Sequence, residues 1–269
     1  MRVIVATSLL IGHWGAALHG QTPELEQLVV DNHLVFTPRG PGPFPVVVAI
    51  PGCSGVAFSD SAAEASHPDL REDDRLFRGH YPRAAARLAS EGFAVLLIDV
   101  HTAEGLVTAC GGEIPSERIA QYIDTSVAWA RGLDIVDEGR VHVIGWSMGG
   151  GGLLAWLRGV RSQAAAVSSA IAVYPDCRIR EPLTSQIPVL MLLGGADDIA
   201  LPSECEDIVA ATRERARITV RTYPGARHGY DITDAPPVLD IGGGMTIGFQ
   251  QAAADATWLE IVEFLHLRR

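Results

Sequence analysis

"VHVIGWSMGGGG", residues 141–152, is the stretch that decides the fold of this 269-residue chain. An apolar, β-branched run ends at Gly145, Ser147 stands at the bend, and Gly149 begins a predicted helix. A serine flanked in this way on a turn from strand to helix matches the G-x-S-x-G nucleophile elbow. The two glycines let the strand and the helix approach each other without Cβ clashes. The same letters also suit an ordinary glycine-rich turn of a parallel sheet, so the rest of the chain has to discriminate between the two.

Segments typical of strands and of helices alternate on both sides of this motif. Continuous apolar runs are typical of strands buried on both faces of a parallel sheet, and apolar side chains spaced at 3.6 residues are typical of helices. We expect strands over 46–50, 93–100, 140–146, 164–175, 187–195 and 216–225, and helices over 83–92, 116–131, 149–160, 203–215 and 252–267. This alternation predicts an α/β protein with a mostly parallel central sheet and helices on both faces.

The first 20 residues differ in composition from the rest of the chain. Arg2 precedes a short apolar run, and small residues follow, among them Ala17 and Gly20. A secretory signal peptide has this order of regions, and cleavage after either small residue fits it. We therefore expect a signal peptide over residues 1–20 and a single domain over residues 21–269. An N-terminal strand or a hydrophobic anchor is the alternative.

The chain is acidic, with a formal net charge of −11 at pH 7. Residues 1–20 contain one basic and no acidic residue, so their removal changes the charge to −12. An acidic chain is unsuited to binding phosphate backbones or anionic membranes, and no apolar run reaches the roughly 18 residues of a membrane span. We expect a small-molecule substrate, no nucleic acid and, after signal cleavage, no membrane. The sequence leaves the oligomeric state open.

The four cysteines are Cys53, Cys110, Cys177 and Cys205. They fit an exported protein in an oxidising compartment, either secreted or periplasmic. Four cysteines allow three pairings; we favour Cys53–Cys110 and Cys177–Cys205, because each pair would join loops that follow neighbouring strands. Their spacing lacks the clustering of a zinc site, so we expect no metal. Four reduced cysteines in a cytosolic protein are the alternative.

Two further side chains would complete a catalytic triad with Ser147. A serine hydroxyl is a poor nucleophile until a base takes its proton. His228 follows the strand predicted at 216–223 and would be that base, and Asp197 follows the strand predicted at 187–195 and would orient the histidine. Functional side chains of parallel sheets gather at the carboxyl ends of the strands. The order serine, acid, histidine is that of the α/β-hydrolase fold.

Other residues compete for the same roles. Asp198 adjoins Asp197, and we favour Asp197 while the sequence leaves its neighbour open. His101 follows the strand at 93–100, but it comes too early for the usual order of the triad. His142 lies inside a predicted strand, where a structural role is expected.

The backbone N–H groups of two residues are candidates for an oxyanion hole. Met148 follows the nucleophile directly, at the start of the predicted helix. Cys53 lies in "PGCSG", the loop after the strand at 46–50, where the second donor of this fold is expected. A disulfide at Cys53 would stiffen that loop. An ordinary glycine turn is the alternative for "PGCSG".

With these motifs placed, the chain resembles the dienelactone hydrolase family of α/β-hydrolases over residues 28–267. The likeness is carried by "IPGCSG", "LASEGFAVLLIDV", "GRVHVIGWSMGG", "VYPDC", "PVLMLLGGADD" and "YPGARHGYD". It looks closest to exported members that have serine in place of the cysteine nucleophile and cysteines near these four positions. The resemblance implies a Ser147–His228–Asp197 triad that hydrolyses small esters or lactones through an acyl-enzyme, without a cofactor.

The chain departs from that family at two places. Relatives commonly begin the oxyanion loop with His-Gly, where this chain has Pro51-Gly52. Many relatives have an arginine after the fourth strand, where this chain has Glu104 in "HTAEG". An acidic residue at that position makes dienelactones that bear a carboxylate less suitable as substrates.

Several alternatives to an ester or lactone hydrolase stay open. The motifs "PGCSG", "GWSMGGGG" and "ADDIA" are also similar to those of bacterial cutinases and polyester hydrolases, although such enzymes usually have an aromatic residue at the position of Cys53. Trp146, directly before the nucleophile, would line the acyl site or fill the space beneath the elbow. A serine peptidase and a non-catalytic binding protein on a hydrolase scaffold are the remaining alternatives.

Overall fold

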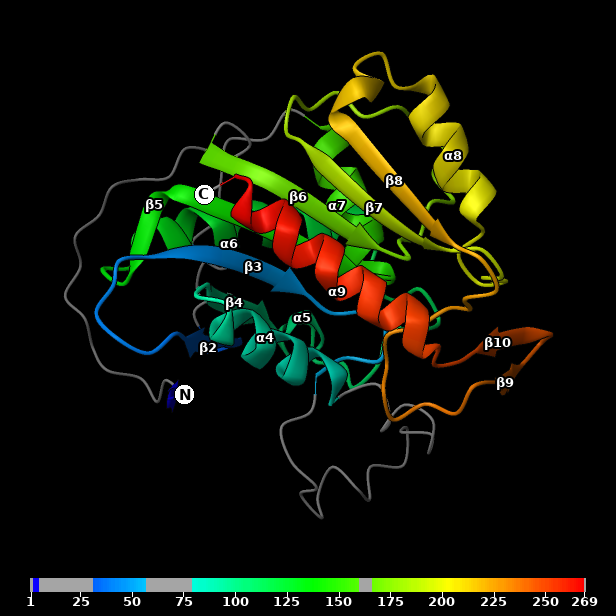
Figure 1. Cartoon of the computed structure of the whole chain (residues 1–269), viewed down its shortest axis with the longest axis horizontal. Helices are drawn as coiled ribbons and strands as arrows, with labels where there is room; N and C mark the ends of the chain where they lie inside the picture. Colours follow the sequence, from blue (N-terminus) through cyan, green and yellow to red (C-terminus); the bar gives the residue numbers. More distant parts are fainter. Residues whose placement is uncertain (1, 5–30, 57–78, 160–165, 269) are drawn as a thin grey trace.

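The computed structural model describes residues 2–4, 31–56, 79–159 and 166–268, which form one large sheet between two layers of helices (Figure 1). Its strands are β1 (Arg2–Ile4), β2 (His33–Thr37), β3 (Phe44–Ile50), β4 (Ala94–Ile98), β5 (Val136–Trp146), β6 (Val167–Val173), β7 (Val189–Gly194) and β8 (Ile218–Tyr223). The helices are α4 (His80–Ser90), α5 (Val100–Ala103), α6 (Ser116–Arg131), α7 (Met148–Arg158), α8 (Pro202–Ala211) and α9 (Gln251–His266), with a 3₁₀ turn at Arg215–Arg217.

The sheet has the order β1-β2-β4-β3-β5-β6-β7-β8. All strands from β4 to β8 in that order run parallel, whereas β2 pairs antiparallel with β4 and β1 pairs antiparallel with β2. The prediction of a mostly parallel α/β sheet is therefore confirmed. Because parallel strands end at the same edge, the loops after β3, β5, β7 and β8 meet at one side of the molecule.

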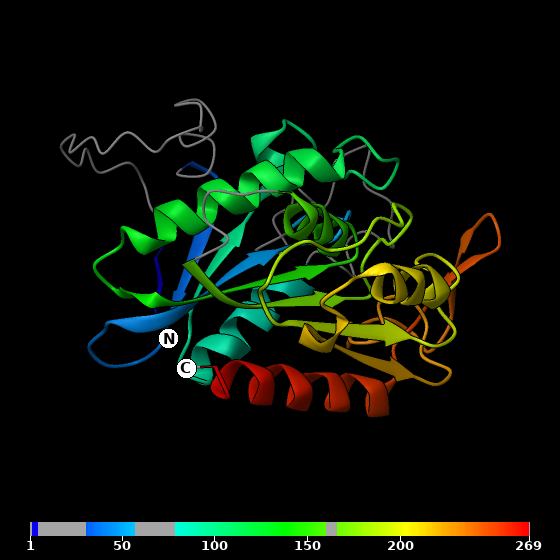
Figure 2. The same ribbon diagram turned by 90° about the horizontal axis from the view of Figure 1, so that it is seen from above.

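Two hydrophobic cores lie on opposite faces of the sheet. Along β3, Val46, Val48 and Ile50 face the core under α6 and α7, while Val47 and Ala49 face the core under α4 and α9. Figure 2 shows α6 and α7 on one side of the sheet and α9 with α4 on the other. This layering fixes the central strand β5, and the turn that follows it, from both faces.

A short hairpin, β9 (Leu239–Gly242) with β10 (Met245–Ile247), projects beyond the carboxyl ends of the strands (Figure 1). The sequence did not predict it, nor the single turn of helix α5. The helix expected over 116–131 has those bounds as α6, and the helix expected over 83–92 begins earlier, at His80 of α4. Most of the segment between β3 and α4 lies outside the described residues.

The predicted signal peptide also falls largely outside the described residues, apart from Arg2–Ile4, which form the edge strand β1. Within the described ranges, no helix combines the length and the apolar character needed to cross a bilayer.

Candidate active site

The nucleophile elbow takes the geometry expected from its glycines. Ser147 alone separates the end of β5 from the start of α7, with φ 50° and ψ −116°. Positive φ is rare for residues other than glycine, and such strain concentrates at functional sites. A Cβ on Gly145 would lie 2.5 Å from the carbonyl oxygen of Gly149, and a Cβ on Gly149 would lie 2.5 Å from that of Ile50. Both positions therefore require glycine.

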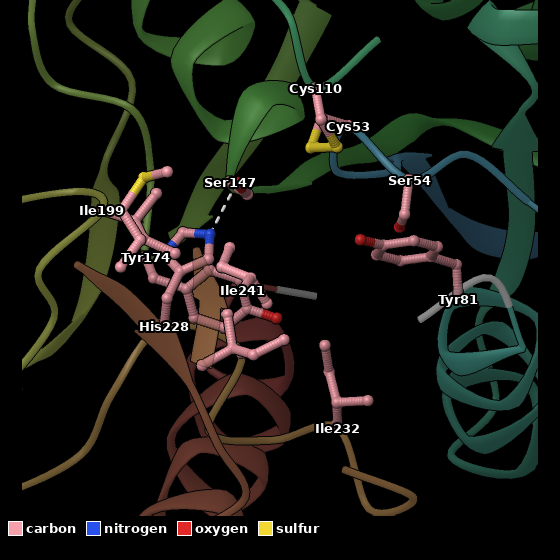
Figure 3. A pocket seen from close by; sticks show the side chains of 13 residues that line it. Cys53, Ser54, Tyr81, Cys110, Ser147, Tyr174, Ile199, His228, Ile232 and Ile241 are labelled. Carbon is pink, nitrogen blue, oxygen red and sulfur yellow. Dashed lines mark hydrogen bonds between the residues drawn. A yellow bond between two sulfur atoms is a disulfide. The ribbon is translucent and has the colours of Figure 1, made fainter. Parts of the chain in front are cut away.

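The structure brings Ser147, His228 and Asp197 together from three loops; Figure 3 shows the first two of them. Ser147 Oγ lies 2.8 Å from His228 Nε2, and His228 Nδ1 lies 2.8 Å from Asp197 Oδ2. An ionised carboxylate only accepts hydrogen bonds, so Nδ1 donates to Asp197 and the neutral ring has Nε2 free to accept the serine proton. The histidine is thus held in the tautomer that a general base requires.

The two neighbouring aspartates point in different directions. Asp197 is buried, and its second oxygen accepts from the backbone N–H groups of Ile199 and Ala200 at 2.9 and 2.8 Å. Asp198 instead accepts from the backbone N–H of Thr246 in β10 at 2.8 Å. The geometry thus favours Asp197 as the partner of the histidine, and Asp198 anchors the hairpin.

The competing histidines lie elsewhere. His101 is buried beside the loop that contains Cys53, with Nε2 3.0 Å from the carbonyl oxygen of Cys53. His142 is buried within β5, where Nδ1 lies 2.8 Å from Ser169 Oγ. Neither of these contacts brings a ring to Ser147, and the structural role expected of His142 fits its position.

The loop that contains Cys53, which the sequence predicts to supply an oxyanion donor, is held by a disulfide and by hydrogen bonds to its backbone. Cys53 is bonded to Cys110. Its carbonyl oxygen accepts from the backbone N–H of Ala109 at 2.8 Å and from Thr108 Oγ1 at 3.2 Å, beside the ring of His101. These contacts fix the orientation of the Cys53 residue. Met148 opens α7, so its N–H belongs to the first turn, whose N–H groups have no acceptor within the helix.

The second disulfide lies on the other side of the elbow. It joins Cys177, after β6, to Cys205 in α8. The structure therefore contains the pairing that the sequence favoured, and both bonds lie at the carboxyl edge of the sheet. Within the described ranges, no group of histidine, cysteine or acidic residues is arranged to hold a metal ion.

A cavity of about 260 Å³ opens over Ser147 and His228. Most of its walls are apolar, from isoleucines, a methionine, two tyrosines and the first disulfide (Figure 3). The lining residues are Cys53, Ser54, Tyr81, Cys110, Ser147, Tyr174, Ile199, His228, Gly229, Ile232, Ile241, Met245 and Ile247. This set contains no lysine or arginine. Three of its members, Ile241, Met245 and Ile247, come from the β9–β10 hairpin.

Two side chains of α6 bind Glu104. Its Oε1 accepts from Arg118 Nε at 2.6 Å and from the Tyr122 hydroxyl at 2.8 Å. The acidic residue found where relatives have an arginine is therefore tied to α6 and supplies no anion-binding group to the cavity.

A buried network that the sequence did not reveal lies beneath the triad. Asp231 accepts from the Tyr174 hydroxyl at 2.6 Å and from Trp146 Nε1 at 3.3 Å, and His80 Nε2 lies 3.4 Å away. Burial by itself would raise the pKa of Asp231, but the charge of His80 and these donors hold the pKa below its usual value. The Tyr174 ring packs against the His228 ring with centroids 4.8 Å apart.

Trp146 belongs to this network and is absent from the cavity walls. It is only 1% exposed, because its side chain points to the face of the sheet covered by α4. Trp146 therefore fills the space beneath the elbow and does not line the acyl site. Asp231 stands three residues after His228 in the sequence. This proximity to the predicted base was the one feature of the sequence that could have pointed to the network.

The fold and the site have the arrangement of a known family. The sequence model of the dienelactone hydrolase family matches residues 79–267. The chain belongs to the dienelactone hydrolase family. A curated relative from Methylorubrum extorquens, named "Putative carboxymethylenebutenolidase", is 23% identical over 207 residues, which cover 72% of this chain. The matched part spans 65% of that relative's length.

Solved structures agree with the family assignment at the level of the fold. The "Putative Dienelactone Hydrolase" from Klebsiella pneumoniae subsp. pneumoniae MGH 78578 is 17% identical with a TM-score of 0.65, and the match covers 87% of this chain and 92% of that one. A dienelactone hydrolase-like promiscuous phosphotriesterase from metagenomic libraries is 18% identical with a TM-score of 0.63, covering 88% and 92%.

Proposed function

We propose that this dienelactone hydrolase family member is a serine hydrolase of carboxylic esters or lactones, with Ser147 as nucleophile, His228 as base and Asp197 as its orienting acid. The observation that supports this most directly is the pair of 2.8 Å contacts that link the three side chains. Ser147 and His228 line a cavity whose walls are mostly apolar.

In the first half of the reaction, His228 Nε2 takes the proton of Ser147 as Oγ attacks the ester carbonyl carbon. The carbonyl oxygen becomes an oxyanion, which the N–H groups of Met148 and Cys53 bind. When the tetrahedral intermediate collapses, the bond to the leaving oxygen breaks and His228 returns the proton to the alcohol. An acyl-enzyme on Ser147 remains.

In the second half, His228 takes a proton from water, and the hydroxide attacks the acyl carbon. The same two N–H groups bind the second oxyanion. Collapse breaks the bond to Ser147 Oγ, which recovers its proton from His228, and the carboxylic acid leaves. Asp197 holds the imidazole in one tautomer and stabilises its charged form throughout.

The proposed substrates are uncharged esters or lactones with an apolar group. Burying a carboxylate without a cation is unfavourable, and no lysine or arginine is found among the described residues that line the cavity. Glu104 stands at the position where relatives have an arginine, and it is already paired with Arg118. No cofactor takes part in the proposed reaction.

We also propose that the protein is exported, with residues 1–20 as its signal peptide and residues 21–269 as one domain. Two disulfides in the described part of the chain support this location, because such bonds persist in oxidising compartments.

The first test of the proposed activity is reaction with a fluorophosphonate probe, followed by mass spectrometry of the labelled peptide. We expect the label on Ser147, and its loss in Ser147→Ala and His228→Ala. Ser54, the second serine lining the cavity, is the internal control and should stay unlabelled. A folded protein that takes up no label would contradict the proposal and favour a non-catalytic binding protein.

Turnover then tests the substrate class. Two p-nitrophenyl esters of equal chain length, one uncharged and one ending in a carboxylate, differ only in charge. We expect kcat/KM to be at least about tenfold higher for the uncharged ester, equivalent to about 1.4 kcal/mol. Equal values of kcat/KM for the two esters would contradict the proposed preference for uncharged substrates. Polyester films and peptide substrates assayed in parallel distinguish the cutinase-like and peptidase alternatives.

A further inference from the structure

Tyr81 lies on the wall of the cavity opposite His228. It is the second residue of α4 and is only 3% exposed, with its ring packed edge-on against Trp146 at a centroid distance of 5.7 Å. Figure 3 shows its hydroxyl beside Ser54, directed into the cavity. The steps proposed above for acyl transfer do not use the Tyr81 side chain.

The Tyr81 hydroxyl lies against the peptide that precedes Cys53. A Cβ built on Gly52 would be 2.5 Å from the Tyr81 oxygen and 3.2 Å from Ser147 Cβ. The phenol oxygen and the nucleophile are thus on the same side of the oxyanion loop, near the N–H that we propose as a donor. Glycine at position 52 is what allows the hydroxyl to come this close.

The hydrogen bonds of Tyr81 leave its own proton available. The Ser54 hydroxyl and the Gly52 backbone N–H bond to its oxygen, and both lower its pKa, as donors do. Burial is the larger effect and raises the pKa of Tyr81 to about 12. A phenol oxygen that accepts two hydrogen bonds still carries one O–H to donate. At neutral pH that O–H is intact, and Tyr81 lines the cavity.

We propose that the Tyr81 hydroxyl is a further catalytic group, which donates a third hydrogen bond to the oxyanion alongside the N–H groups of Met148 and Cys53. This inference rests on the proposed acyl transfer at Ser147. The first turn of α4 holds the donor in place, because Tyr81 packs on Trp146 and the adjacent His80 pairs with the buried Asp231. A donor fixed in advance needs no reorganisation when the charge develops.

The test compares Tyr81→Phe with the native enzyme. Each is assayed for kcat, for KM and for inhibition by a trifluoromethyl ketone, whose serine adduct carries an oxyanion. We expect kcat to fall about 10²-fold, the inhibition constant of the ketone to rise by a similar factor, and KM to change little. Tyr122→Phe is the matched control, because it removes a buried phenol whose hydroxyl binds Glu104 outside the cavity. It should leave all three quantities within a few-fold of the native values.

Unchanged kcat and ketone affinity in folded Tyr81→Phe would overturn the inference. So would an equal loss of substrate and ketone binding, which indicates a structural role. Failure of the proposed function is distinguishable, since the native enzyme itself would then show neither turnover nor labelling at Ser147.

A second variant covers the case in which Tyr81→Phe does not fold. Tyr81→3,5-difluorotyrosine keeps the shape of the ring and lowers the pKa of the phenol. If the proton of Tyr81 is used, kcat/KM of this variant declines at a lower pH than in the native enzyme, as the phenol ionises. The native profile should show no decline from Tyr81 below about pH 12. Superimposable profiles in the alkaline range would refute the role of the proton.

Discussion

Asp231→Asn should destabilise the protein far more than a change of the same kind at the surface. The carboxylate is 2% exposed, and it accepts hydrogen bonds from Tyr174 and Trp146 while facing His80. An asparagine has nearly the same shape but no charge, and it presents an N–H₂ group to a site that already contains donors. The substitution therefore tests how much the charge contributes, with packing almost constant.

The size of the effect follows from the contacts of Asp231. A hydrogen bond to a charged acceptor contributes about 1 kcal/mol more than a neutral one, so two of them account for about 2 kcal/mol. The N–H₂ group of the asparagine would also face donors in a buried site, and a buried polar group without a partner costs about 1–3 kcal/mol. Taken together, we expect a loss of about 3–4 kcal/mol, or a fall in Tm on the order of 10 °C for a chain of this length.

Urea denaturation at pH 7 measures this loss, with Asp234→Asn as the control. Asp234 pairs with Arg83 at 2.6 Å, but both side chains are about half exposed, at 52% and 50%. Such a pair contributes less than about 1 kcal/mol. If Asp231→Asn lowers the free energy of unfolding by no more than Asp234→Asn does, the assignment of Asp231 as a buried, charged anchor is wrong.

The native protein and Asp231→Asn should also differ in how their stability depends on pH, with a defined sign. The pKa of Asp231 is lowered in the folded state, so its ionised form favours folding. Its contribution is fully present above the unfolded pKa of about 3.9 and is lost as the pH falls through the lower, folded value. The difference between native and Asp231→Asn stability should therefore be constant at neutral pH and shrink below about pH 4. A difference that grows on acidification would contradict this.

Three further outcomes are expected. Asp197→Asn should lower kcat about 10⁴-fold, because the amide no longer fixes the tautomer of the base; Asp198→Asn should cost less than tenfold in the same steady-state assay, and equal losses would contradict the choice between the two. Gly152→Ala should destabilise by about 1–3 kcal/mol in urea denaturation, since its Cβ would lie too close to the Ile119 side chain of α6. Cys110→Ser should lower the free energy of unfolding by about 2–5 kcal/mol and also lower kcat, through a looser oxyanion loop; a folded variant with unaltered kcat would show that the hydrogen bonds of the loop suffice.

The parts of the site that follow a strand in the parallel sheet could be predicted from the sequence. Ser147, Asp197 and His228 each lie in a loop that follows a predicted strand, and parallel strands end at one edge, so their proximity follows from the topology. The disulfide pairing could be argued in the same way, from loops at the ends of neighbouring strands.

The rest of the site depends on contacts for which the local sequence has no signal. Tyr81 comes after a long polar segment, and only the packing of α4 on the sheet brings its hydroxyl to the oxyanion loop. The β9–β10 hairpin has short strands with little alternation, and the glycines at its turn give no tertiary information. Trp146 could be placed on either face of the sheet until the register of β5 was known.

The two walls of the cavity are restrained to different degrees. On one side, covalent bonds hold the Cys53 loop and, across the elbow, the Cys177 loop. On the other side, the hairpin is held by the contacts of Asp198 with Thr246 and by the bridge between His228 and Ile247. The two proposed backbone donors thus lie beside the cross-linked loops, while the hairpin side of the cavity is held by hydrogen bonds. Sequence changes in the hairpin can accordingly alter the shape of the cavity without disturbing the groups proposed to carry out the reaction.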